Sequence, residues 1–482
     1  EHEKFIYNKS DLSLIPFNGD RSISTVLRKF VEDGWTAVVE EDQIVGASKN
    51  GASITLEPGG QFELSGAPLN NLHETCREIN DHLSFTKSIE EELDIGFLGI
   101  GFIPLGGFDD MPKVPKKRYQ QIMTPYMRKV GGLGLEMMYQ TCTVQANFDF
   151  LSEKDMSTKV NVSAALQPLA TGLFANSPFK KGRPNGHLSY RSAIWDDTDK
   201  DRTGILPCML DKSFSFEEYV DYLLDVPVYF ILRNKEYIDS TDFTFRDLMD
   251  GKNKNIKSEE ITIDDWETHV STIFTEVRLK TYIEMRGADA GSYKSLCALP
   301  ALWTGLLYDN ETLDAANDII KGWHLNEILN FKIESSKTGL DALIQNKSGW
   351  RITEEVLEIA VHGLKKRKEF NLSGEDETVF LEYLFKLRFE QIGFKGSLSF
   401  LNLLFLIFIL PFQVNARPVL PDLVGITQSN MSTPRFTAPN ISDGIPTPIK
   451  YLGLSSGISI LMSSKTVNIS FCVSPTARPP IA

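Results

Sequence analysis

Residues 276–286 read Glu-Val-Arg-Leu-Lys-Thr-Tyr-Ile-Glu-Met-Arg, and their alternation decides the fold class. The odd positions carry Val, Leu, Thr, Ile and Met, whereas the even positions carry Glu, Arg, Lys, Tyr, Glu and Arg. A period of two over eleven residues predicts one β-strand with an apolar face and a densely charged face. That charged face is either a sheet face in contact with water, which is the usual case for a single strand, or a polar site built on a sheet.

The same alternation recurs in two other segments. Residues 143–149 place Thr, Gln, Asn and Asp on one face and Val, Ala and Phe on the other. Residues 53–57 and 61–64 alternate in the same way on either side of Pro58-Gly-Gly60, where Pro and Gly occupy the positions that a type II turn prefers. The turn predicts a hairpin, so an antiparallel sheet is expected.

Five carboxylates are expected on polar strand faces. Glu1 and Glu3 are two residues apart and share a face wherever that segment is extended, while the hairpin brings Glu57 and Glu63 to one face. Like charges repel unless a cation lies between them, and hard carboxylate oxygens suit Mg²⁺. The five are Glu1, Glu3, Glu57, Glu63 and Glu284, and the bases Arg278, Lys280 and Arg286 on the same face can bind carboxylate or phosphate groups. Acids for a metal beside bases for phosphate favour nucleotide chemistry, although a solvated sheet face is the commoner explanation of such a pattern.

A second basic segment lies between these strands. Residues 176–186 are rich in Pro, Gly, Asn and Lys, which predicts a loop. Arg191, Lys200 and Arg202 follow it. Loops of this composition can bind anions, but a solvated charged loop is more frequent.

Composition limits the class of protein. The chain has 482 residues, of which 42% are hydrophobic, so it can form a large core. Its net charge of -14 argues against a broad nucleic-acid surface, because binding a polyanion needs a basic face. Five cysteines are too few for a disulfide-framed scaffold. The chain begins at Glu1 rather than Met, so we expect it to derive from a longer precursor, and no targeting segment indicates its compartment.

The chain changes character near residue 395. We expect one catalytic domain over residues 1–395 and a poorly ordered tail over residues 396–482, which carries few charges and many Ser, Thr and Pro residues. The tail begins with an apolar run over residues 398–412. This run is shorter than the roughly 18–20 residues of a membrane-spanning helix, so we favour a buried or interfacial segment over a membrane anchor.

Six motifs, in this order, closely resemble the glutamate–cysteine ligases of the plant and alpha-proteobacterial type. They are Glu1-His-Glu-Lys-Phe5, Ile54-Thr-Leu-Glu-Pro-Gly-Gly-Gln-Phe-Glu-Leu-Ser-Gly66, Thr141-Cys-Thr-Val-Gln145, Ala175-Asn-Ser-Pro-Phe179, Asp197-Thr-Asp-Lys-Asp-Arg-Thr-Gly204 and Glu284-Met-Arg-Gly-Ala-Asp289. The resemblance covers about residues 1–370. It implies an α+β fold in which an antiparallel sheet forms a funnel flanked by helices, as in glutamine synthetase. It also implies the ATP-dependent ligation of L-glutamate, through γ-glutamyl phosphate, to L-cysteine, which is the first step of glutathione biosynthesis.

The resemblance also implies roles for individual residues. The five glutamates named above become the Mg²⁺ ligand candidates, and Gln145 and Asn147 line the nucleotide and metal site. Arg278 is expected to hold the carboxylate of the substrate glutamate and Arg286 the phosphates of ATP. Arg191, Lys200 and Arg202 are secondary candidates for anion binding.

Cysteine positions imply one possible redox switch. Plant enzymes of this type use two intramolecular disulfides, and Cys76 and Cys297 match one pair. Ser240 and the region near Asn255 stand where the second pair would be. The alternative is that Cys76 and Cys297 are two unlinked core thiols. The resemblance further implies a monomer or a redox-dependent homodimer, in the plastid stroma if the source is a plant and in the cytoplasm otherwise.

Two other functions stay open. The chain is either a carboxylate–amine ligase that uses a different amine, or a non-catalytic relative that acts as a binding or regulatory subunit. The intact acidic positions argue against a non-catalytic role. The sequence beyond residue 370, where the family pattern is no longer recognisable, argues for it.

Overall fold

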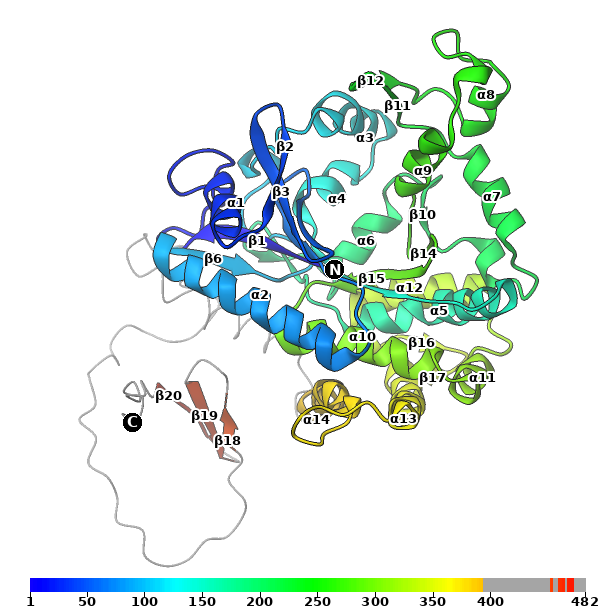
Figure 1. The fold of residues 1–482 in the computed structure, drawn as a ribbon. Coiled ribbons are helices and arrows are strands. Elements are labelled where there is room, and N and C mark those ends of the chain that lie inside the picture. The colour runs from blue at the N-terminus through cyan, green and yellow to red at the C-terminus, as the bar shows by residue number, and fades with distance from the viewer. Residues whose placement is uncertain (393–450, 454–457, 464–465, 472–482) are drawn as a thin grey trace, which may run out of the picture. The chain divides into compact units, whose positions relative to one another are not determined.

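A computed structural model describes residues 1–392, 451–453, 458–463 and 466–471. The chain divides into two compact units, Glu1–Asn415 and Ala416–Ala482, and each is described by itself. The described part of the first unit is a mixed α+β structure with one large antiparallel sheet, which confirms the predicted class. Figure 1 shows helices packed around this sheet.

Within the described residues the main sheet has nine strands in the order β14-β15-β7-β1-β5-β4-β3-β2, with β6 also paired to β1. Its central strand, β1, therefore joins the two halves of the sheet. The strands are β1 (His2–Asn8), β2 (Thr36–Glu40), β3 (Gln43–Lys49), β4 (Ala52–Leu56), β5 (Phe62–Ser65), β6 (Ile95–Leu98), β7 (Thr143–Phe148), β14 (Val277–Leu279) and β15 (Ile283–Asp289). Short strands outside it are β8 (Phe179–Lys180), β9 (Arg183–Pro184), β10 (Thr203–Gly204), β11 (Phe230–Arg233), β12 (Glu236–Asp239), β13 (Phe274–Thr275), β16 (Leu343–Ile344) and β17 (Lys347–Ser348).

The prediction of one long strand over residues 276–286 was wrong. The segment forms a tight hairpin, in which Arg278 of β14 lies opposite Glu284 of β15 and Leu279 lies opposite Ile283. The amide of Lys280 donates to the carbonyl of Tyr282 at 2.8 Å and closes the bend. The sequence contains no sign of the bend, because the bend has no Gly, Pro or Asn. In addition, this hairpin pairs even-numbered residues with even-numbered ones on one face, so the alternation of polar and apolar residues continues through the bend.

The hairpin around Pro58-Gly-Gly60 is confirmed, but its turn is not type II. The amide of Gly60 donates to the carbonyl of Glu57 at 2.9 Å. A type II turn would need a positive φ at Gly59, whereas the structure has it at Gly60, with φ +77°. Gly59 is required for another reason, because a Cβ there would lie 2.2 Å from the carbonyl oxygen of Tyr139.

Helices cover the sheet and supply most of the core. They are α1 (Ile23–Glu32), α2 (Leu72–Leu93), α3 (Thr124–Val130), α4 (Gly134–Gln140), α5 (Glu153–Leu173), α6 (Tyr190–Asp196), α7 (Phe216–Asp225), α8 (Phe245–Met249), α9 (Ile263–Ser271), α10 (Tyr293–Leu307), α11 (Asn310–Ile319), α12 (Leu325–Thr338), α13 (Gly349–Arg367) and α14 (Glu382–Ile392). The largest hydrophobic cluster joins α5, α10 and α13 to the apolar faces of β7 and β15. The sheet thus has one face buried under helices.

Residues beyond 370 are part of this fold. The carboxylate of Glu377 is fully buried, accepts from Nε of Arg367 at 2.7 Å and accepts from the amide of Leu72 at 2.7 Å. It therefore ties the end of α13 to the start of α2. Leu381 and Leu384 are also buried in the main core.

The second unit contains three described strands, β18 (Tyr451–Gly453), β19 (Ile458–Ser463) and β20 (Thr466–Phe471), paired as an antiparallel sheet. The apolar run over residues 398–412 lies outside the described residues. The boundary at residue 395 and the poor order of the tail stay predictions. Among the helices of the described part, none combines the length and the hydropathy that crossing a membrane requires.

The crossing of α10 and α13 depends on two glycines. A Cβ on Gly363 would lie 2.0 Å from the carbonyl oxygen of Gly305, and one on Gly305 would lie 2.3 Å from that of Ala360. Helix propensity alone favours Ala over Gly by about 1 kcal/mol, but overpacking costs about 1–3 kcal/mol. We expect Gly363→Ala to lower the free energy of unfolding, measured by chemical denaturation. Glu358→Ala on the exposed side of α13 is the control and should stay within about 0.5 kcal/mol of the parent; a stabilised Gly363→Ala variant would contradict the close crossing.

Candidate active site

Four of the five predicted carboxylates lie on neighbouring parts of the sheet. Glu3 of β1 is directly opposite Glu63 of β5, and Thr55 of β4 is the next partner of Glu63. Glu57 follows β4 and acts electrostatically on both Glu3 and Glu63. Glu1 precedes β1, where its carboxylate accepts from the side-chain amide of Asn147 at 3.2 Å. The sheet register therefore brings together residues that are as far apart in sequence as 1 and 147.

In the described part of the chain, none of these four carboxylates forms an ion pair with a basic side chain, and their charges raise one another's pKa values. Burial, followed by the negative charges of Glu57 and Glu1, raises the pKa of Glu63 to about 7. Burial and the charges of Glu63 and Glu57 likewise raise the pKa of Glu3 well above its ordinary value, although Arg191 and the amide of Thr143 oppose this. Raised carboxyl pKa values mean that the ionised cluster is unstable as it stands, so a bound cation would be favoured.

The chemistry of these donors fits a hard divalent cation, but their present positions do not form a coordination shell. In the described part of the chain, no group of three or more His, Cys, Asp or Glu side chains is placed to hold one ion. Thr55 hydrogen-bonds to the carboxylate of Glu63, and the amide of Thr143 donates to Glu3 at 3.0 Å. These hydrogen bonds occupy carboxylate oxygens of both acids, so side-chain rotations would have to accompany binding of a metal.

Glu284 has a different environment from the other four acids. It is fully buried, and it accepts from Nε and Nη2 of Arg278 and from Nη1 of Arg286. Burial alone would raise the pKa of Glu284, but the guanidinium groups of Arg286 and Arg278 lower it below its ordinary value. Glu284 is therefore ionised and already paired, and it orients two arginines on the sheet.

The two predicted catalytic arginines differ in how many donors they use. Arg278 uses Nε and Nη2 on Glu284 and Nη1 on the carbonyls of Ser271 and Ile273. Arg286 uses Nη1 on Glu284 and on the side-chain oxygen of Gln145. Arg278 is thus anchored through all three nitrogens, whereas the hydrogen bonds of Arg286 run through one nitrogen.

Of the secondary anion candidates, only Arg191 joins this cluster. It belongs to α6, it is 3% exposed, and its Nη2 donates to the carbonyl of Arg286 at 2.9 Å. Its Nε is buried with no hydrogen-bond partner in the described part of the chain. Lys200 is exposed, and Arg202 is fully buried with its nitrogens bonded to Asp199, Thr272 and Pro227. A guanidinium nitrogen that is buried without an acceptor makes Arg191 the better candidate to bind an anion.

The sequence patterns did not predict two basic residues, Lys116 and Arg118, that lie near Glu57. Lys116 is buried, and its amine donates to the carbonyl of Leu56 at 3.1 Å. Burial and Arg118 lower the pKa of Lys116 to about 8, while Glu57 opposes the shift. The Nε of Arg118 is buried without a partner in the described residues. The only signal for them was the basic run at residues 116–118, which is more typical of a solvated loop.

The two cysteines of the predicted redox pair lie close together. Cys76 of α2 and Cys297 of α10 are both buried and are free thiols in this structure. Burial and a hydrogen bond with Cys297 raise the pKa of Cys76. The thiols are therefore neighbours, as a disulfide would require.

Comparisons with known proteins point to one family. A family model described as "Glutamate-cysteine ligase family 2 (GCS2)" matches residues 1–396, which is further than the expected 370 residues. "Glutamate--cysteine ligase A, chloroplastic" from Oryza sativa subsp. indica is 51% identical over 381 residues, covering 79% of this chain and 77% of the relative. "Glutamate--cysteine ligase, chloroplastic" from Medicago truncatula is 52% identical over 368 residues, covering 76% and 72%. The relative of the same name from Arabidopsis thaliana is 51% identical over 383 residues, covering 79% and 73%.

Removing one charge from the carboxylate cluster should stabilise the metal-free protein. Burial and the charges of Glu57 and Glu1 raise the pKa of Glu63 from an ordinary 4.5 to about 7 in the fold. Between these pH values the unfolded chain binds fewer protons than the folded chain, so stability falls as the pH rises. We expect Glu63→Gln, in the presence of a chelator, to raise the melting temperature at pH 8 and to have little effect at pH 4.5. The gain at pH 8 should be on the order of 1–3 kcal/mol.

The control for that experiment is Glu217→Gln, because Glu217 is exposed at the start of α7 and remote in sequence from the cluster. Its melting temperature should follow the parent at both pH values. A Glu63→Gln variant that melts below the parent at pH 8 would show that the cluster is not a source of repulsion.

Proposed function

Because the chain belongs to glutamate–cysteine ligase family 2, we propose that the carboxylate-bearing face of its sheet binds Mg²⁺ and ATP to join L-glutamate to L-cysteine. An enzyme of this type forms γ-glutamylcysteine in glutathione biosynthesis. The observation that carries the proposal for the site is the cluster of uncompensated carboxylates beside arginines with unused donors.

The chemistry explains why acids and bases share this face. A carboxylate does not react with an amine to form an amide, because it has no good leaving group. The γ-carboxylate of glutamate therefore first attacks the terminal phosphorus of ATP, and the bond between that phosphorus and ADP breaks. The amine of cysteine then attacks the acyl carbon of γ-glutamyl phosphate; a C–N bond forms, phosphate leaves with the electron pair of the broken C–O bond, and the amine releases protons. Bound Mg²⁺ would neutralise phosphate oxygens during the transfer.

Different residues of this face are proposed to bind the metal, the nucleotide and the substrate glutamate. We propose that the acids hold Mg²⁺, that Gln145 and Asn147 line the nucleotide site, and that Arg286 binds the phosphates through its remaining donors. Arg278 is proposed to hold the glutamate carboxylate, and the unpaired Nε of Arg191 supports a share in that role. Lys200 stays a secondary proposal, whereas the predicted anion role of Arg202 is not proposed further, because its three nitrogens are bonded to Asp199, Thr272 and Pro227. The proposed metal ligands are Glu1, Glu3, Glu57 and Glu63, whereas Glu284, the fifth predicted ligand, is already paired with Arg278 and Arg286 and is proposed to orient them.

Three further properties are proposed on the family relationship. The sheet is taken as the funnel of a glutamine-synthetase-like architecture. Cys76 and Cys297 are taken as a redox-sensitive pair, which their contact supports, in a monomer or a redox-dependent homodimer. Since the relatives are named as chloroplastic, we propose the plastid stroma as the compartment.

The central test is phosphate release from ATP by the purified chain. We expect release only when Mg²⁺, L-glutamate and L-cysteine are all present, and we expect mass spectrometry to identify γ-glutamylcysteine. Glu57→Gln should lower turnover by at least about tenfold, since it removes a charged ligand worth 1.4 kcal/mol or more, whereas Glu217→Gln should retain it. Release with another amine but not with cysteine would identify a ligase of different specificity. A folded chain that binds ATP without releasing phosphate would indicate a non-catalytic relative.

Arg191→Lys tests the substrate role of Arg191 separately. Lysine keeps the charge but loses the planar fork and Nε, so we expect the KM for glutamate to rise by roughly 10–100-fold, the equivalent of one charge-assisted hydrogen bond. Arg202→Lys is the matched control: its ion pair with Asp199 is structural, so it should lower the melting temperature without raising that KM selectively. Equal KM values for glutamate in Arg191→Lys and in the parent would show that Arg191 does not bind this substrate.

A further inference from the structure

A basic segment lies over the end of β4, next to Glu57. The amine of Lys116 and the hydroxyl of Tyr119 both donate to the carbonyl of Leu56, at 3.1 and 3.2 Å. Leu56 immediately precedes Glu57, and Arg118 lies between the two residues that hold the segment in place. Glu57 accordingly acts electrostatically on Arg118. The fold therefore brings a guanidinium group to the edge of the acidic cluster.

The guanidinium of Arg118 has donors and charge that the protein does not use. Its Nη2 donates to the hydroxyl of Tyr119 at 3.3 Å, and its Nε is buried with no hydrogen-bond partner in the described residues. The ion pairs found in that part of the chain do not include Arg118. A guanidinium has five N–H donors and stays charged at any physiological pH, so its need for an acceptor does not depend on titration. An anion beside Arg118 would meet that need.

The neighbouring Lys117 has the opposite arrangement. Its Nζ lies 3.0 Å from the carboxylate of Glu41 and 3.7 Å from that of Glu236, so its charge is balanced by acids. A solvated basic loop is thus an adequate explanation for Lys117 but not for Arg118. In addition, Arg118 begins a single π-helical turn, Arg118–Met123, that continues into α3. Such turns are rare and occur frequently at functional sites.

Arg118 lies at the other end of the acidic cluster from the arginines of the β14–β15 hairpin. In the strand order β14-β15-β7-β1-β5-β4, Arg278 and Arg286 belong to the first two strands, Glu3 to β1, and Glu57 follows β4 beside Arg118. Guanidinium groups therefore flank the acids on both sides. A metal ion neutralises only some oxygens of a nucleotide that it binds, so further cations around the ion can bind the remaining phosphate oxygens.

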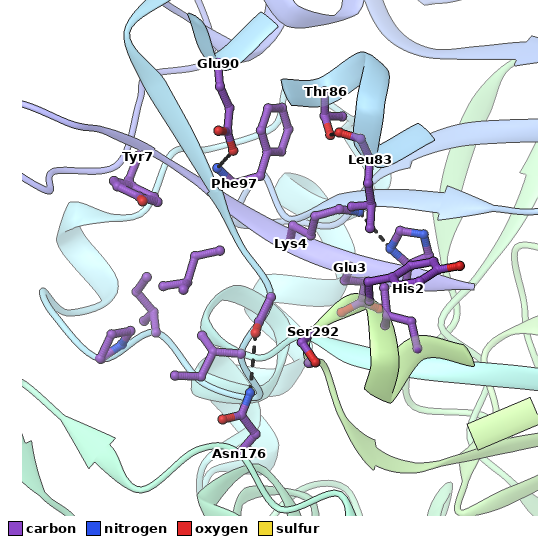
Figure 2. Close-up of a pocket in the computed structure, with 18 of the residues that line it drawn as sticks. His2, Glu3, Lys4, Tyr7, Leu83, Thr86, Glu90, Phe97, Asn176 and Ser292 are labelled. Carbon is purple, nitrogen blue, oxygen red and sulfur yellow. Dashed lines mark hydrogen bonds between the residues drawn. The ribbon is translucent and has the colours of Figure 1, made fainter. Parts of the chain in front are cut away.

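The largest pocket of the described part of the chain is less suited to phosphates. This pocket, of about 740 Å³, lies between β1, α2, β6 and the start of α10, and of the proposed metal ligands only Glu3 lines it (Figure 2). Its described lining contains no arginine. Of its lysines, Lys9 and Lys87 pair with Glu90, and the amine of Lys4 contacts two histidines. Arg118 is therefore better placed than this pocket to bind a phosphate group beside the acids.

We propose that Arg118 forms a second oxyanion-binding position on the polar sheet face and binds a phosphate group of ATP from the side of β4. Its unpaired donors would bind oxygens of that phosphate, while Tyr119 holds Nη2. This inference rests on the proposed function, because it takes the acids as the metal site. A carboxylate of L-glutamate would offer the same chemistry, but Arg278 and Arg191 at the other end of the cluster are already available for it.

The test is isothermal titration calorimetry of the full chain with Mg²⁺-ATP and, separately, with L-glutamate. We expect Arg118→Gln to weaken the binding of Mg²⁺-ATP by roughly 10–100-fold, the equivalent of one charge-assisted hydrogen bond, and to change the affinity for L-glutamate by less than about threefold. Lys117→Gln is the matched control, and it should change neither affinity by more than about threefold, because its ion pairs are screened by solvent.

The outcomes separate this inference from the proposed function. A parent chain that does not bind Mg²⁺-ATP would contradict the proposed function and the role of Arg118 with it. Equal affinities of the parent and Arg118→Gln for Mg²⁺-ATP would overturn only the role of Arg118. Weaker binding of L-glutamate with unchanged binding of Mg²⁺-ATP would show that the oxyanion is a carboxylate, and would likewise overturn the assignment to phosphate.

A structural role, in which Arg118 only orders Glu57, makes a different prediction. Loss of that order would weaken the binding of Mg²⁺ in the absence of nucleotide, whereas removal of a positive charge near Glu57 should leave this binding unchanged or make it tighter. Weaker binding of Mg²⁺ by Arg118→Gln would therefore overturn the proposal. Arg118→Lys is the second variant should Arg118→Gln not fold: it keeps the charge but loses the planar fork, so we expect at least about fivefold weaker binding of Mg²⁺-ATP. Unchanged binding by a folded Arg118→Lys, with folding confirmed by its melting temperature, would also overturn the proposal.

Discussion

Two carboxylates that face each other across a pair of strands are the constraint on which this molecule depends. The register of β1 and β5 places Glu3 directly opposite Glu63, and the turn after β4 adds Glu57. Like charges directly opposite each other destabilise a sheet, and these are buried as well. The surrounding fold must therefore be stable enough to hold them, which is the part played by the large cluster of α5, α10 and α13 on the apolar face of β7 and β15.

Among the described residues, ion pairs neutralise Glu284, and the other four acids form none. Glu284 is paired with two guanidinium groups, which is the arrangement expected of a buried charge that has a structural role. Within the described ranges, the hydrogen bonds to Glu3 and Glu63 come from neutral donors, the amide of Thr143 and the hydroxyl of Thr55. This division separates an arginine half of the sheet, suited to anions, from an acidic half, suited to a cation. A nucleotide that binds together with a metal ion needs both halves: basic side chains for its phosphates and acidic side chains for the metal.

Sequence patterns predicted which side chains lie on the polar face of the sheet better than they predicted where the strands begin, bend and end. Alternation identified β7, the β4–β5 hairpin and the charged residues of β14 and β15, because side-chain parity survives folding. It did not identify the bend at residues 280–282, because parity is the same in a hairpin as in a continuous strand. Nor could it find Lys116 and Arg118, which reach Glu57 only through tertiary packing. The family resemblance was traced only to residue 370 for the same reason, although the predicted domain ran to residue 395: Glu377 contributes through contacts with Leu72 and Arg367, and no local pattern indicates them.

The alternation of β1 has a consequence that connects the two sides of the sheet. Glu3 and Lys4 are adjacent and both buried, and their side chains lie on opposite faces of one central strand. Burial raises the pKa of Glu3 and lowers the pKa of Lys4 to about 7, so the charged form of each is disfavoured. They cannot neutralise each other, because neighbouring side chains on a strand point in opposite directions. A cation that ionises Glu3 therefore has to come from outside the strand. Since β1 pairs with β5, β6 and β7, three neighbouring strands fix its position, so a cation bound by Glu3 would contact a strand whose register is already set.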